Sequence, residues 1–115
     1  MIREAIQDAQ LSIRTAPQLG IKGLEKHHVA TNKGSWRRVF ADLFQAAKMN
    51  LSDKLNIIKL PSHFDPHRLY NYAICTRLTN AVQGLVESSA AYRKALRKQL
   101  LLIRKELRNP NSDLS

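Results

Sequence analysis

The sequence predicts an all-α protein, a small four- to five-helix bundle in one domain. Apolar residues recur at helical spacing in several segments, and no stretch sustains the two-residue alternation of a strand. The 115 residues are 43% hydrophobic, enough for one core. We expect a single helical domain over residues 1–109 with an irregular basic loop at 17–35, followed by a polar C-terminal tail at 110–115.

The first helix is predicted over residues 2–16, because apolar residues recur there every three or four positions and Pro17 ends the pattern. The loop at 17–35 holds three of the four glycines and has no period. A short helical turn at Leu24–His28 is compatible with it. Long irregular connections are commonly functional or disordered, so we expect Gly20–Gly34 to become ordered on a partner.

The second helix is predicted to begin after Ser35, whose hydroxyl can accept a hydrogen bond from an unpaired backbone N–H. One face of this helix holds its large apolar side chains, Trp36, Val39, Phe40, Leu43, Phe44 and Ala47. The register of Trp36 with that face favours burial in the core over stacking on a base. A shorter third helix is predicted from Ser52 to about Lys59, ended by Pro61.

A fourth helix is predicted after Asp65-Pro66, an N-cap acceptor followed by proline. Its apolar side is formed by Ile74, Leu78, Ala81, Val82, Leu85 and Val86. Ser88 and Ser89 either begin a separate helix or lie within one rod that continues to Arg108. When residues 92–108 are projected as a helix at 100° per residue, their seven cations lie on a different arc from the apolar side chains. The apolar arc consists of Tyr92, Leu96, Leu100, Ile103 and Leu107.

The formal net charge of +10 lies in two segments. Residues 22–38 contain five cations and one glutamate, and residues 93–108 contain seven cations and one glutamate. The charges elsewhere cancel. A basic excess concentrated in this way is typical of proteins that bind phosphate groups. The predicted nucleic-acid-binding residues are therefore Lys22, Lys26, Lys33, Arg37, Arg38, Arg93, Lys94, Arg97, Lys98, Arg104, Lys105 and Arg108.

No group of residues predicts catalysis, so we expect a non-enzymatic protein without cofactors and without catalytic residues. His63 and His67 have ligand spacing, but Pro66 interrupts the helix that would align them, and we expect no metal site. His27 and His28 are interpreted as polar loop residues that contact phosphate. Cys75 is interpreted as a small core residue rather than a nucleophile.

The stretch Leu85-Val86-Glu87-Ser88-Ser89-Ala90-Ala91-Tyr92-Arg93-Lys94 resembles a late helix in the small helical subunits of CRISPR effector complexes. The resemblance covers about ten residues without a specific motif, and this chain continues beyond them. It implies several copies stacked along a guide RNA–target duplex that contact the backbone without reading its sequence.

These observations predict a non-catalytic accessory subunit of a larger ribonucleoprotein or DNA-bound complex that binds the RNA or DNA backbone. Its expected partners are nucleic acid and other protein subunits, including copies of itself, and no membrane. The alternative is an assembly module whose basic helix docks on an acidic partner. A sequence-specific DNA reader is a third class, for which no helix-turn-helix turn is visible. The single cysteine and the polar N-terminus predict a cytoplasmic protein.

Overall fold

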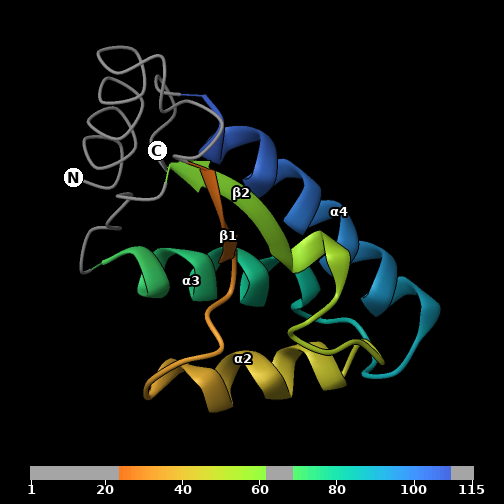
Figure 1. The fold of residues 1–115 in the computed structure, drawn as a ribbon. Coiled ribbons are helices and arrows are strands. Elements are labelled where there is room, and N and C mark those ends of the chain that lie inside the picture. Colours follow the sequence, from red (N-terminus) through yellow and green to blue (C-terminus); the bar gives the residue numbers. More distant parts are fainter. Residues whose placement is uncertain (1–23, 62–68, 110–115) are drawn as a thin grey trace.

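The computed structural model describes residues 24–61 and 69–109 of the chain. These residues form a mixed α/β fold with three α-helices and one two-stranded antiparallel sheet, so the prediction of an all-α bundle is wrong. Figure 1 shows the arrangement. The elements are β1 (Leu24–His28), α2 (Trp36–Gln45), a 3₁₀ turn (Lys54–Asn56), β2 (Ile57–Pro61), α3 (Tyr70–Val82) and α4 (Ala90–Leu107).

The sheet joins two segments that are far apart in the sequence. Its register runs from Leu24 opposite Pro61 to His28 opposite Ile57. The first half of β1 is exposed, so the strand lacks the apolar alternation that would reveal it. Its conformation is set by pairing with β2, which a local pattern cannot show. Residues 24–28 of the predicted irregular loop are therefore a strand.

The helix predicted over residues 52–59 is also wrong. Leu55 and Ile58 are three residues apart, which suggests a helical face, but the Asp53 carboxylate accepts a hydrogen bond from the Leu55 amide at 2.9 Å and starts only one 3₁₀ turn. The chain then extends, and Ile58 and Leu60 are buried at the two-residue spacing of a strand. Two successive β-branched residues at 57–58 favour that extended backbone.

Helix α2 has most of the apolar face that the sequence predicts, but Val39, which the helical spacing places on that face, is 42% exposed. Phe40 and Phe44 are fully buried, and the Trp36 ring stacks on Phe40 with centroids 5.7 Å apart. Trp36 packs against the core, in agreement with core burial rather than base stacking. Ser35 does precede the helix, but its side chain makes no capping hydrogen bond.

Helices α3 and α4 are separate. After Val82 the chain turns through Gly84 (φ +80°) and Ser88 (φ +65°), which leaves Leu85 and Val86 exposed instead of on the core face. The Ser89 hydroxyl then accepts a hydrogen bond from the Tyr92 amide at 3.1 Å and caps α4.

The predicted apolar arc of α4 is buried, and its five members are the core contribution of this helix: Tyr92, Leu96, Leu100, Ile103 and Leu107. They join α3 residues such as Ile74 and Leu78, and strand residues such as Ile58. In Figure 1, β2 runs beside α4, β1 lies next to β2, and α2 is drawn on the far side of α3 from the sheet.

Several predictions fall outside the described residues. They are the helix at 2–16, the Asp65-Pro66 helix start and the tail at 110–115. The division of the chain into domain and tail stays a prediction. Within residues 24–61 and 69–109, no helix is long and apolar enough to cross a membrane.

Candidate functional site

The structure separates the predicted nucleic-acid-binding cations into different groups. Lys26 of β1 meets Arg104 and Arg108 of α4 around one pocket, although these residues are almost 80 positions apart in the sequence. Arg37 and Arg38 are exposed on α2, away from that pocket. Lys22 lies outside the described residues.

The pocket has a volume of about 500 Å³ and lies between the sheet, the 3₁₀ turn and the C-terminal half of α4. Among the described residues, five of the lining side chains are cationic and none is acidic. The pocket is lined by Lys26, Ser52, Lys54, Ile57, Lys59, Arg104 and Arg108. Lys54 and Lys59 were not among the predicted binding residues. We call this feature the basic pocket.

Arg104 holds α4 against the start of β2. Its Nη1 atom donates hydrogen bonds to the carbonyl oxygens of Lys54 and Leu55, both at 3.3 Å, and of Ile57. Partial burial and the neighbouring charge of Arg108 lower the pKa of Arg104. A guanidinium stays protonated in spite of such a shift, so the pocket keeps this positive charge.

The remaining cations of α4 lie on its solvent side. Arg93, Lys94, Arg97, Lys98 and Lys105 are exposed, as the helical projection predicts. Four of them surround Leu101, which is 53% exposed. We call Arg93, Lys94, Arg97 and Lys98 the outer face of α4. Their role in binding nucleic acid stays a prediction.

The two adjacent histidines end β1 and lie on opposite faces of the sheet. His27 is paired with the buried Ile58, which places it on the core face, and its Nε2 atom is shielded from solvent. His28 is paired with Ile57, a residue that lines the basic pocket. Since side chains alternate along a strand, His28 shares its face with Lys26.

The backbone that follows His28 is fixed by two buried polar side chains. Asn56 is fully buried, and its Oδ1 atom accepts from the Ala30 amide at 2.7 Å while its Nδ2 atom donates to the Ala30 carbonyl at 2.9 Å. The Tyr70 hydroxyl donates to the Val29 carbonyl at 3.0 Å. These bonds hold the end of β1 in one position relative to α3.

His28 is kept electrically neutral by its surroundings. Partial burial lowers the pKa of His28 below its ordinary value of 6.5, and the charges of Lys33 and His27 lower it further. The imidazole is therefore mostly unprotonated at neutral pH. A neutral imidazole can accept a proton, which is the requirement for a general base.

In the described part of the chain, no three His, Cys, Asp or Glu side chains lie close enough to hold a metal ion. His63 and His67 lie outside the described residues, so the sequence prediction about a metal stays untested. Cys75 packs against the core, and its Sγ atom lies 3.8 Å from the Thr79 hydroxyl oxygen.

A family model matches residues 9–107, most of the chain. It describes the AHH family, a nuclease family of the HNH/ENDO VII superfamily with conserved AHH. The chain belongs to the AHH family. No curated protein matches the chain, and no solved structure matches it.

Membership of the AHH family corrects two predictions from the sequence. The resemblance to CRISPR small subunits is wrong, because the family that covers residues 9–107 is a nuclease family. The expectation of a non-enzymatic protein is wrong for the same reason. The coarser expectation, a protein concerned with nucleic acid, agrees with the family.

The sequence contains one pair of adjacent histidines, so the family motif falls on Lys26-His27-His28, with lysine in place of the alanine. Sequence reasoning missed the importance of this pair because it assigned His27 and His28 to a loop. It also missed Asn56, whose role depends on contacts with residue 30. The available signal was the histidine pair directly before Val29 and Ala30, two small apolar residues typical of a buried segment.

Proposed function

We propose that this AHH-family protein hydrolyses phosphodiester bonds in nucleic acid, with His28 as the general base. The observation that carries the proposal is the environment of His28. Asn56 and Tyr70 hold the backbone of Val29 and Ala30, directly after His28, in place. Burial and the charges of Lys33 and His27 lower the pKa of the His28 side chain. A nuclease base has to be neutral when the substrate binds, and these features keep it so.

In the proposed reaction, His28 takes a proton from a water molecule as the water oxygen forms a bond to phosphorus. The bond from phosphorus to one ester oxygen breaks, and that oxygen takes a proton from solvent. The products are a phosphate monoester and a hydroxyl group. The cations on the same face of the sheet, Lys26 and Lys59, favour binding of the negatively charged backbone.

The test compares cleavage by the wild-type protein and by the His28→Ala variant on fluorescently labelled single-stranded RNA, single-stranded DNA and duplex DNA. Each substrate is assayed with Mg²⁺ and with EDTA. Loss of a general base lowers kcat by about 10²- to 10⁴-fold. Circular dichroism and the thermal midpoint establish whether the variant is folded.

Added imidazole supplies the missing base in solution, so it restores part of the activity of His28→Ala if His28 acts by proton transfer. The same imidazole has no such effect on the wild-type protein. A folded His28→Ala variant that cleaves at the wild-type rate contradicts the assignment of the base. A wild-type protein that cleaves none of the substrates under either condition contradicts the proposed activity.

A further inference from the structure

The basic pocket is the second feature on the face of the sheet that carries His28. Resting on the proposed function, we propose that it is a phosphate subsite that holds the nucleic-acid backbone beside the scissile bond. Its ligand is a non-scissile phosphate group of the same substrate. The pocket thus positions the nucleic-acid strand at His28 and takes no part in proton transfer.

The first argument is geometric. Lys26 lines the pocket and lies two residues before His28 on the same face of β1. Alternate residues of a β-strand are about 6.8 Å apart, so Lys26 and His28 are close enough to contact the same stretch of nucleic-acid backbone. Ile57, opposite His28, lines the same pocket. The pocket therefore lies on the face of the sheet that carries His28 and beside this residue.

The second argument is the charge of the lining. Lys26, Lys54, Lys59, Arg104 and Arg108 bring five cations from β1, the 3₁₀ turn, β2 and the C-terminal end of α4 around about 500 Å³, and no acidic side chain lines this space among the residues that the structure describes. Like charges repel, so a bound phosphate group offsets part of the repulsion among these side chains. Ser52 also lines the pocket, and its hydroxyl donates to the Asn50 Oδ1 atom.

The third argument is that part of the pocket is built into the fold. Arg104 is oriented by hydrogen bonds to the carbonyls of Lys54, Leu55 and Ile57. Those bonds fix the C-terminal half of α4 against the strand that carries Lys59. A phosphate group fits this arrangement better than a flexible acidic peptide, because the five cations line one pocket of about 500 Å³ instead of an extended surface.

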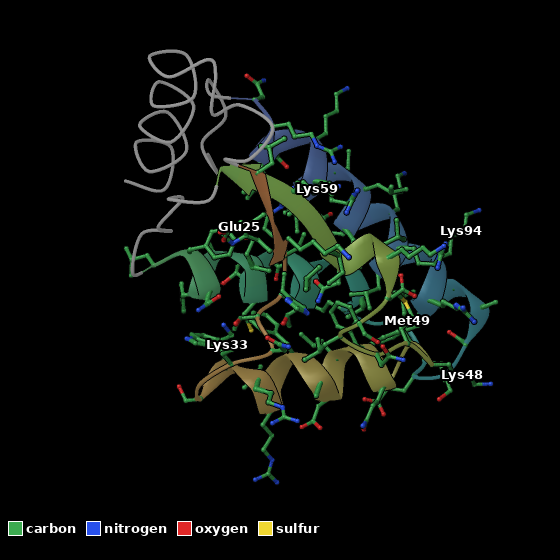
Figure 2. The ribbon with its side chains drawn as sticks, viewed as in Figure 1. Glu25, Lys33, Lys48, Met49, Lys59 and Lys94 are labelled. Atoms are coloured by element: carbon green, nitrogen blue, oxygen red, sulfur yellow. The ribbon has the colours of Figure 1, made fainter. Side chains whose placement is uncertain are left out.

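The experiment removes charge from the pocket while leaving Arg104 in place. Lys59→Gln and the double variant Lys54→Gln/Lys59→Gln each alter exposed side chains. Lys48→Gln is the matched control, because Lys48 is also exposed and lies far from Lys59 (Figure 2). Cleavage of a labelled 12-nucleotide substrate is measured at 50 to 200 mM KCl.

We expect KM to rise about three- to fivefold for Lys59→Gln and about tenfold for the double variant, as for exposed ion pairs, with little change in kcat. The dependence of log KM on log salt becomes shallower by roughly 0.7 to 0.9 for each lost contact. Lys48→Gln leaves both quantities at the wild-type values. An unchanged KM in the double variant, or an equal change in Lys48→Gln, overturns the proposal.

A binding measurement separates this proposal from the proposed catalytic role of His28. The ¹H–¹⁵N spectrum of His28→Ala is titrated with the 5′-phosphorylated dinucleotide pdTpdT, which this variant cleaves poorly if His28 is the base. The expected shifts lie at Lys26, Lys59 and Arg104, and they weaken in the double variant. Shifts confined to other surfaces overturn the subsite whether or not His28 proves to be the base.

Discussion

The basic pocket and the outer face of α4 carry the same kind of charge but differ in how their side chains are held. In the pocket, Arg104 donates to three backbone carbonyls, and Lys26 and Lys59 project from paired strands. On the outer face, Arg93 and Lys98 are exposed on one helix that has Leu101 between its cations. Only the pocket shares a face with His28.

This difference separates electrostatic attraction from positioning. A row of solvated cations attracts nucleic acid in a way that salt screens strongly, and it does not fix a strand in one register. A pocket in which Arg104 is anchored to the backbone, and the lysines project from paired strands and a 3₁₀ turn, restricts where a phosphate can lie. We therefore expect substitutions in the pocket region to affect folding and cleavage, and substitutions on the outer face to leave folding unchanged.

The largest expected effect is that of Asn56→Ala, a change at the buried side chain that precedes β2. The Asn56 side chain makes three hydrogen bonds to the backbone of Ala30 and Leu51 in a buried environment. Its removal leaves buried backbone groups unpaired, so we expect a loss of about 3 to 5 kcal/mol in the free energy of unfolding. Urea denaturation followed by circular dichroism measures it.

Asn80→Ala is the control for this measurement, because Asn80 is exposed on α3. The control should change stability by less than about 0.5 kcal/mol. If Asn56→Ala also changes the free energy of unfolding by less than about 0.5 kcal/mol, the Asn56 side chain does not hold the end of β1. The contrast between an anchored pocket region and a solvated outer face is then wrong.

A smaller effect is expected for Arg104→Ala compared with Arg97→Ala. Both changes remove one arginine charge from α4, but only Arg104 donates to the carbonyls at residues 54, 55 and 57. We expect Arg104→Ala to destabilise the protein by about 1 to 3 kcal/mol and Arg97→Ala by less than about 0.5 kcal/mol. Thermal unfolding at a fixed ionic strength compares the two.

Equal destabilisation by the two arginine variants shows that the contacts of Arg104 add nothing to folding. Arg104 and Arg97 then belong to one electrostatic surface. A larger loss of stability in Arg104→Ala than in Arg97→Ala supports the distinction between the pocket and the outer face of α4. The two variants have the same net charge and differ only in the contacts that the wild-type side chain makes.

The sequence allowed the helices to be predicted where their contacts are local. The five buried residues of α4 and the pair Phe40 and Phe44 of α2 follow from helical spacing, since one face of a helix is visible within about ten residues. The sheet could not be predicted in this way. Leu24 to Lys26 are exposed, and the partner strand lies more than 30 residues away.

The candidate site was only partly predictable for the same reason. Lys26, Arg104 and Arg108 were identified from charge alone, but nothing local indicates that they meet, or that Lys54 and Lys59 join them. His28 was visible as a residue but not as a base, because its neutrality depends on burial and on Lys33. Local patterns reveal which residue types are present, and long-range contacts decide what they do.

The smallest expected effect is a change in pH dependence in Lys33→Gln. Because burial, Lys33 and His27 lower the pKa of His28 from 6.5, the cleavage rate of the wild-type protein should fall as the pH drops through a value below 6.5. Without Lys33, protonation of His28 is less unfavourable. The acid limb should therefore move to higher pH while burial and His27 still keep it below 6.5.

The pH profile of kcat/KM measures this shift, and titration of His28 followed by NMR assigns it to the correct histidine. Lys48→Gln is again the matched control, because it removes one exposed lysine charge away from β1. A general loss of positive charge would move the limb equally in both variants, whereas the local effect of Lys33 moves it in only one. The contrary outcome is a shift of the His28 pKa by NMR in Lys33→Gln without any shift of the acid limb of kcat/KM. In that case the group whose protonation limits cleavage is not His28, and His28 is not the base of the proposed reaction.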